Sequence, residues 1–242
     1  MYPAAMRSLK RPLNWILLGI ALVSLVAILL GHENSFVRTA VCWRVACPEF
    51  ANAHAWEKIA YDLGIGSIVS LFFYWLVVRL PENAKRRRIR KSFAEHFREF
   101  KENSIASMLM VTDETFEWGF QRELVDQKKF REYFKQQVAP GQDRWDALHN
   151  KMTDYYLDEL LTHLDILRGE ILFAMSAIEI DDKRVLEFLK RLSATIIKMR
   201  KTTRDYDSMK GFGNFMWEVF AGWSMVTGYQ ERDFFEDMIH AI

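Results

Sequence analysis

Two long apolar stretches dominate the pattern of hydrophobic and polar positions along the chain. The first covers residues 13–31 and the second covers residues 61–80. A helix needs about 20 residues to cross the hydrocarbon core of a bilayer, and both stretches come close to that length. Each is therefore predicted to be a transmembrane helix, with residues 32–60 forming the loop between them.

A basic N-terminal tail, residues 1–12, precedes the first apolar stretch, and signal peptides begin in the same way. The stretch is longer than the roughly 7–15 apolar residues of a signal-peptide core. No convincing small-x-small cleavage site follows it before His32. A first transmembrane helix is the favoured interpretation, and a cleaved signal peptide is the alternative.

Beyond Pro81 the apolar positions recur with a helical period. Phe93, Phe97 and Phe100 begin a stripe with steps of three and four residues. The second span is therefore expected to continue, after a break near Pro81, as a helix that leaves the membrane. Thr112 and Asp113 are predicted to cap the next helical segment.

That next segment covers residues 115–138, and the Pro140-Gly141 turn signal ends it. Two longer helices follow, because apolar residues alternate in steps of three and four over residues 157–178 and again over residues 185–199. Residues 150–206 are predicted to form an antiparallel hairpin that turns near residues 179–182. No strand-like alternation competes. The predicted fold class is all-α: two transmembrane helices followed by a cytosolic helical bundle with a long antiparallel helical hairpin.

The formal net charge of +1 hides a strong asymmetry. Residues 92–242 carry 20 Lys and Arg against 27 Asp and Glu, whereas residues 1–12 and 81–91 together carry nine Lys and Arg and one Glu. The loop at 32–60 has only three cations. Clustered cations resist translocation, so both termini are predicted to be cytoplasmic and the loop periplasmic.

The segment 81–91 is a basic juxtamembrane segment that can meet the anionic lipids of the inner leaflet. Its cations are Lys85, Arg86, Arg87, Arg88, Arg90 and Lys91. The domain that follows, residues 92–242, is acidic overall, which disfavours a broad nucleic-acid-binding face.

The two cysteines of the chain, Cys42 and Cys47, both lie in the predicted periplasmic loop. In an oxidising compartment a pair at this spacing is a candidate disulfide. Two unpaired thiols are the alternative. A zinc site is disfavoured because His32 and His54 lie outside ligand spacing.

Small residues mark one face of the second span. Gly66 and Ser70 form a small-xxx-small pair, which lets helix backbones approach closely in lipid. They are the candidate packing residues of a homo-oligomer. Asp62 and Arg79 lie near the two ends of the span and are interpreted as interfacial charges. An acidic ring at the mouth of an oligomeric pore is the alternative for Asp62.

The sequence contains no phosphate-binding loop, Walker sequence, HExxH motif or nucleophile elbow. Arg144 and His149, and likewise Arg90 and His96, match the loose Arg-x4–6-His spacing of HEPN ribonucleases, which are helical. A chain with this many Arg and His residues is expected to contain such pairs by chance. We therefore predict no catalytic residue, no cofactor and no metal site, and the chain is not expected to be an enzyme.

The second arm of the predicted hairpin carries a basic stripe. Its candidate docking residues are Lys183, Arg184, Lys190, Arg191, Lys198 and Lys201. One interpretation is pairing with the acidic residues of the first arm. The other is a docking surface for an anionic partner such as lipid headgroups, a nucleic acid or an acidic protein.

The segment from Phe212 to Gln230 is rich in aromatic residues and is too short for a third span. Packing of these rings in the core of the domain is the default expectation. An interfacial helix on the inner leaflet is the alternative, because Trp and Tyr favour that zone.

The two spans, the KRRRIRK run after the second and a helical domain give the chain a recognisable architecture. It resembles the small two-span inner-membrane effectors of bacterial anti-phage defence systems, including those paired with retrons. The resemblance covers the whole chain and implies permeabilisation of the inner membrane that kills or arrests an infected cell. A cytosolic protein or ribonucleoprotein is a possible partner. The alternative is a non-toxic membrane scaffold that docks a cytosolic partner.

Overall fold

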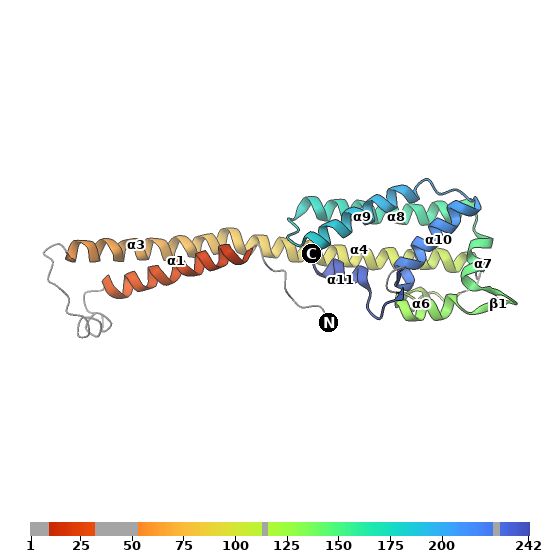
Figure 1. The fold of residues 1–242 in the computed structure, drawn as a ribbon, viewed down its shortest axis with the longest axis horizontal. Helices are drawn as coiled ribbons and strands as arrows, with labels where there is room; N and C mark the ends of the chain where they lie inside the picture. Colours follow the sequence, from red (N-terminus) through yellow and green to blue (C-terminus); the bar gives the residue numbers. More distant parts are fainter. Residues whose placement is uncertain (1–9, 32–52, 113–115, 225–227) are drawn as a thin grey trace. The chain divides into compact units, whose positions relative to one another are not determined.

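The computed structural model describes residues 10–31, 53–112, 116–224 and 228–242. Helices make up most of these residues, which confirms the predicted all-α class. In chain order the elements, labelled where space allows in Figure 1, are α1 (Lys10–Gly31), α3 (Ala53–Tyr74), the π-helix η1 (Trp75–Arg79), α4 (Leu80–Thr112), α5 (Phe120–Glu123), α6 (Gln127–Phe134), β1 (Gln137–Ala139), β2 (Gln142–Asp143), α7 (Arg144–Lys151), α8 (Asp154–Ala177), α9 (Lys183–Met199), α10 (Tyr206–Ala221), β3 (Trp223–Ser224), β4 (Gly228–Tyr229) and α11 (Phe234–His240).

The backbone stays helical through Pro81, where the sequence predicted a break. Proline lacks a backbone N–H, and its ring crowds the carbonyl group four residues earlier, here that of Val77. The π-helix η1 directly precedes it, and the Leu80 N–H donates to the carbonyl oxygen of Trp75, five residues back. This local change of hydrogen-bond pattern accompanies the proline. The helical run therefore continues from Lys58 to Thr112.

The helix start predicted at Thr112 and Asp113 is wrong for Thr112, which is the last residue of α4. Its hydroxyl donates back to the Met108 carbonyl oxygen at 3.2 Å, so it does not cap a following helix. Asp113 lies outside the described residues. The single helix expected next is two helices, α5 and α6, because the Asp126 carboxylate accepts from the Lys128 and Lys129 N–H groups and starts a new one.

Two antiparallel pairs of very short strands were not predicted. The β1–β2 hairpin pairs Gln137 with Asp143, and Gly141 lies in its turn with φ of 77°. The β3–β4 pair joins Trp223 to Tyr229. Strands of two or three residues are too short to show the alternation that predicts strands from sequence.

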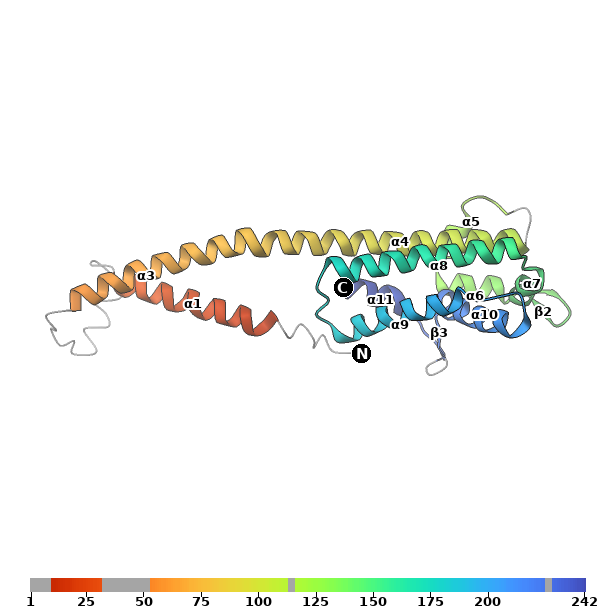
Figure 2. The same ribbon diagram turned by 90° about the horizontal axis from the view of Figure 1, so that it is seen from above.

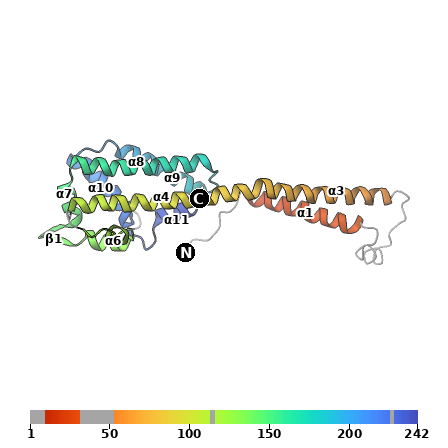
Figure 3. The same ribbon diagram turned by 180° about the vertical axis from the view of Figure 1, so that it is seen from behind.

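The chain divides into two compact units, residues 1–85 and residues 86–242. In the first unit, α1 packs along α3 (Figures 1 and 3). Large apolar side chains of both helices are exposed; Trp15 is 70% and Leu63 is 66% exposed. Among the side chains described in this unit, only Ser24 and Gly64 are buried.

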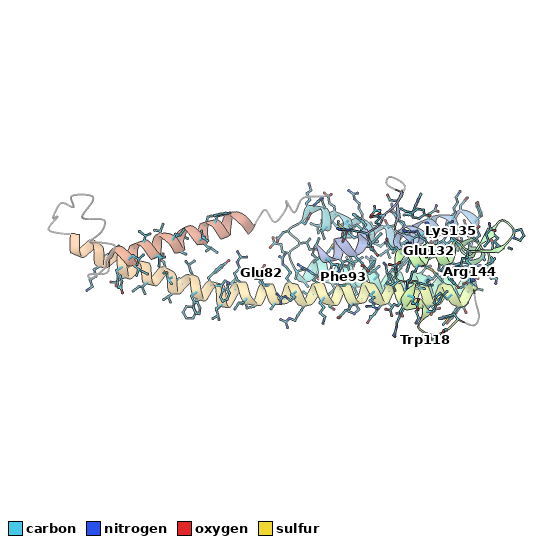
Figure 4. All side chains as sticks on the ribbon, turned by 90° about the horizontal axis from the view of Figure 1, so that it is seen from below. Glu82, Phe93, Trp118, Glu132, Lys135 and Arg144 are labelled. Atoms are coloured by element: carbon cyan, nitrogen blue, oxygen red, sulfur yellow. The ribbon has the colours of Figure 1, made fainter. Side chains whose placement is uncertain are left out.

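In the second unit α4 and α8 run antiparallel, side by side (Figures 2 and 3). Two polar contacts give the register: Ser107 Oγ lies 3.5 Å from His163 Nε2, and His96 Nδ1 lies 3.5 Å from a Glu170 carboxylate oxygen. Phe93, labelled in Figure 4, is 2% exposed and begins the buried face of α4.

The helices α8 and α9 form an antiparallel pair, and Arg200 Nε lies 3.0 Å from an Asp165 carboxylate oxygen across it. The Asp182 carboxylate starts α9 by accepting from the Arg184 N–H. Their apolar seam is buried and consists of Leu157, Leu160, Leu164, Leu167, Ile171 and Ala174 on α8 and Val185, Leu189, Leu192 and Ile196 on α9.

Aromatic side chains of α10 fill the centre of the second unit. The Phe220 ring lies 5.6 Å from that of Phe100 and 5.5 Å from that of Phe130, measured between centroids. The Trp217 ring lies 4.9 Å from that of Trp145. The aromatic residues of α10 therefore belong to the core and are not available to lie on a membrane.

Candidate functional site

The contact between α1 and α3 is built around Gly64. A Cβ atom at this position would lie 2.9 Å from Ile28 Cγ1 and 2.9 Å from the carbonyl oxygen of Ser24. Only glycine lets the two backbones come this close. The predicted packing residues were Gly66 and Ser70, because a single helix sequence shows which residues are small and not which face meets a neighbour.

Gly66 and Ser70 lie on another face of α3. Among the described residues, no atom outside its own helix backbone lies within 4 Å of a Cβ built on Gly66. The Ser70 hydroxyl donates to the Gly66 carbonyl oxygen at 2.8 Å. That bond satisfies the hydroxyl inside the helix, so Ser70 needs no hydrogen-bond partner from another helix. Packing of copies through these two residues stays a prediction.

An open groove of about 730 Å³ runs between α1 and α3 on this face. We call it the span groove; its lining is Leu17, Ile20, Ile59, Asp62, Leu63, Gly66, Ser67, Ser70, Leu71 and Tyr74. The lining is mostly apolar and includes Asp62, whose side chain is exposed. A groove with small residues on its floor can accept an apolar side-chain ridge from another helix.

The six juxtamembrane cations do not all face solvent. Arg86 forms an ion pair with Asp181 in the α8–α9 connection, at 3.1 Å between Nη1 and Oδ2. Arg90 is half-buried, and its Nε has no hydrogen-bond partner in the described structure. Lys91 lies 3.6 Å from Glu95 on its own helix. Lys85, Arg87 and Arg88 are exposed, and their contact with anionic lipid stays a prediction.

The basic stripe of α9 pairs only partly with acidic residues. Lys183 and Arg191 both lie 3.8 Å from Glu187 of the same helix, and Arg184 contacts Asp182 at 3.8 Å. Its other members, Lys190, Lys198 and Lys201, have no ion-pair partner among the described residues. The expected pairing with α8 is made by Arg200 and by Arg204, outside the six.

A polar cleft of about 730 Å³ is lined by residues of α7, of α10 and of the segments beside them. His149 stands in it with Nδ1 2.7 Å from the Trp145 carbonyl oxygen, and its ring lies against the backbone of Gly213, where a Cβ would overlap it. Arg144 points elsewhere and stacks on Tyr133, 4.5 Å from the ring centroid. The Arg144 and His149 side chains thus do not converge on one point.

One buried charge escaped the sequence analysis. Lys101 of α4 is 1% exposed and forms an ion pair with Asp233, the residue before α11. The signal was present, because Lys101 follows Phe97 by four residues and therefore falls on the apolar face of the predicted helix. Lysine on such a face is rarely buried without a partner.

Burial also perturbs one histidine. The pKa of His163 is lowered because its half-buried position disfavours the charged imidazolium, and the nearby Glu159 carboxylate opposes this in part.

The predicted disulfide residues Cys42 and Cys47 lie outside the described residues. Within the described ranges, no three His, Cys, Asp or Glu side chains come together as metal ligands would. One described helix, Lys58–Thr112, has the length and composition to cross a membrane, and the described apolar part of α1, Trp15–Leu29, is shorter than that criterion. Comparisons of the chain with protein-family models, curated proteins and solved structures gave no match.

Proposed function

We propose that the chain is an inner-membrane effector of a bacterial antiviral, abortive-infection system. In this proposal α1 and α3 both cross the membrane, both termini are cytoplasmic, and the second unit is a cytosolic helical bundle. When this domain is triggered, the spans disturb membrane integrity. No catalysis, cofactor or metal is involved.

The observation that supports this best is the uninterrupted helix from Lys58 to Thr112. Its first part is apolar, and only 6% of its most apolar window is buried. Its last part carries Phe97, Ile105 and Leu109 in the core of the second unit. Because one helix belongs to both regions, a change in how the domain holds α4 acts directly on the segment that enters the membrane.

Two helices cannot enclose a water-filled path alone, so permeabilisation requires several copies of the chain. The span groove supplies the surface in this proposal, because Gly66 leaves its floor open. A leucine at position 66 or 70 fills that floor yet is at home in lipid. It should therefore block assembly without blocking insertion.

The test is expression in bacteria with a membrane-potential dye as readout. The parent chain should depolarise the cells, whereas Gly66→Leu and Ser70→Leu should not, at equal membrane abundance. The control Val69→Leu changes an exposed apolar residue of α3 that does not line the groove and should depolarise like the parent. Leucine variants as active as the parent would show that this groove does not assemble a pore.

A membrane scaffold that docks an anionic cytosolic partner is the second candidate. The exposed Lys190 and Lys198 of α9, with Lys201 just beyond its end, favour it, because surface cations left unpaired are available to a partner. Cells that stay polarised at high expression of the parent, together with loss of partner binding in a triple lysine-to-glutamine variant, would favour the scaffold over the effector.

A further inference from the structure

A buried ion pair attaches the C-terminal helix α11 to α4. The Lys101 ammonium group pairs with the Asp233 carboxylate, which is 11% exposed. A Glu236 carboxylate oxygen lies 3.9 Å from the same nitrogen, and the Phe97 ring centroid lies 5.2 Å from it. A charge buried this deeply is strongly disfavoured unless it is paired. The position of α11 is therefore tied to Lys101.

The Asp233 carboxylate does two things at once. Its Oδ1 accepts hydrogen bonds from the Phe235 N–H at 2.9 Å and the Glu236 N–H at 3.2 Å, so Asp233 is the N-cap of α11. Its Oδ2 pairs with Lys101. One side chain thus starts the helix and attaches it to α4.

The helix is too short to persist when it is not docked. It has seven residues, and isolated helices shorter than about 12 residues are marginal in water. Docked, its Phe235 ring stacks on Phe97 with centroids 6.3 Å apart and meets Phe188 of α9 edge-on at 5.2 Å. Folding of α11 and its docking are therefore a single event, so the helix is either docked or released.

Apolar side chains alone could attach α11 to α4 without a buried ion pair. Replacing a buried ion pair by apolar residues is often neutral or stabilising, whereas removing one partner is strongly destabilising. The ion pair thus makes docking depend on one carboxylate without adding much stability of its own. A contact that is lost when one charge is lost can act as a switch.

We propose that α11 is a latch on α4. Docked, it holds α4 in the observed packing; released, it leaves Phe97 and Lys101 uncovered, and α4 repacks. This inference rests on the proposed function, because α4 belongs to the same helical run as the apolar segment of α3. Release of α11 is then the event that triggers the effector.

The test uses the full chain in membranes and two matched variants of one helix. Asp233→Asn removes the charge that pairs with Lys101, and Glu236→Gln removes the exposed second carboxylate. Hydrogen exchange of the α11 amides should become about 100-fold faster in Asp233→Asn. The same variant should depolarise cells at an expression level at which the parent does not. Glu236→Gln should match the parent in both readouts.

Three outcomes would overturn the latch. Exchange that stays at the parent rate shows that the ion pair does not hold α11. Faster exchange without depolarisation, while the parent depolarises cells at high expression, shows that release is not the trigger and leaves the proposed function standing. If exchange is faster but neither the parent at any expression level nor any variant depolarises cells, the proposed function is wrong as well.

A rescue variant separates the latch from a general loss of folding. Lys101→Met combined with Asp233→Asn leaves no unpaired buried charge, and asparagine is still a good N-cap. Exchange in α11 should return to within about tenfold of the parent rate, and the cells should stay polarised. Exchange as fast as in the single variant would overturn the proposal, even if Asp233→Asn alone unfolds the domain.

Discussion

The two units of the chain use apolar residues in opposite ways. Among the side chains described in the first unit, most large apolar ones are exposed, and only Ser24 and Gly64 are buried. In residues 86–242 the large side chains are inside, with Phe130 fully buried and Phe220 1% exposed. Water drives apolar groups together, whereas lipid does not, so helices in lipid associate through close backbone packing. This contrast is what we expect if lipid surrounds the first unit and water surrounds the second, as the proposed function requires; we call this the two-solvent account.

The sharpest way to test this contrast is a charge on the seam of the second unit. Leu164→Asp should unfold or insolubilise the domain, because Leu164 is 1% exposed and an unpaired buried charge costs at least several kcal/mol. Leu192→Asp on the facing helix should do the same. The control is Ile166→Asp on the same helix, where the side chain is 57% exposed. Thermal unfolding of the purified chain is the measurement, and a Leu164→Asp protein as stable as Ile166→Asp would refute the seam.

In the first unit the sensitive position is a glycine. Gly64→Leu should push α1 and α3 apart, because its Cβ already meets backbone at 2.9 Å, and should destabilise their packing by about 3 kcal/mol. Gly66→Leu, two residues on and with open space around it, should leave the packing intact. The measurement is thermal unfolding in detergent. Equal effects of the two variants would mean that Gly64 is not the contact.

A third comparison uses two glycines of α10. Gly213→Ala should destabilise the second unit by about 1–2 kcal/mol, because its methyl group overlaps the His149 ring and the ring must move. Gly211→Ala has no neighbour within 4 Å and should stabilise the helix by roughly 0.5–1 kcal/mol. Thermal unfolding of both variants measures the difference, and shifts of the same sign would contradict the placement of His149.

The smallest expected effect is a pH dependence. The pKa of His163 is lowered by burial in the folded state, so the unfolded chain binds the proton more tightly. Stability contributed by neutral His163 should therefore be present above about pH 6.5, the unfolded value, and should be lost as the pH falls below it. The melting temperature should therefore fall as the pH is lowered below about 6.5, and this fall should be smaller in His163→Asn than in the parent. An equal fall in the two proteins would show that a titratable group other than His163 causes it.

The sequence predicts the second unit well where periodicity carries the information. The seam residues of α8 and α9 follow from apolar steps of three and four, because a water-soluble helix must bury that face. The same reasoning places Lys101 on the apolar face of its helix, but periodicity does not indicate which distant residue pairs with it, here Asp233. It also placed a break at Pro81, because periodicity does not reveal a π-helical turn.

The first unit is harder to predict, because its two predicted spans, residues 13–31 and 61–80, are apolar on nearly every face. Length and hydropathy indicate the span, but they do not distinguish the face that meets α1 from the face that lines the span groove. Gly64 and Gly66 look alike in the sequence. They differ in that Gly64 lies on the face of α3 that contacts α1, and Gly66 does not. The basic segment shows the same limit. Its run of cations suggests that every side chain faces solvent, yet Arg86 pairs with Asp181.

The topology of the chain in a bacterial membrane tests the two-solvent account most directly. A pair of reporters fused after Ile242, one active only in the cytoplasm and one only in the periplasm, reads the location of the second unit. The account predicts activity of the cytoplasmic reporter alone, in a fusion that resists carbonate extraction from the membrane. A periplasmic signal at Ile242, or release of the fusion by carbonate, would contradict it.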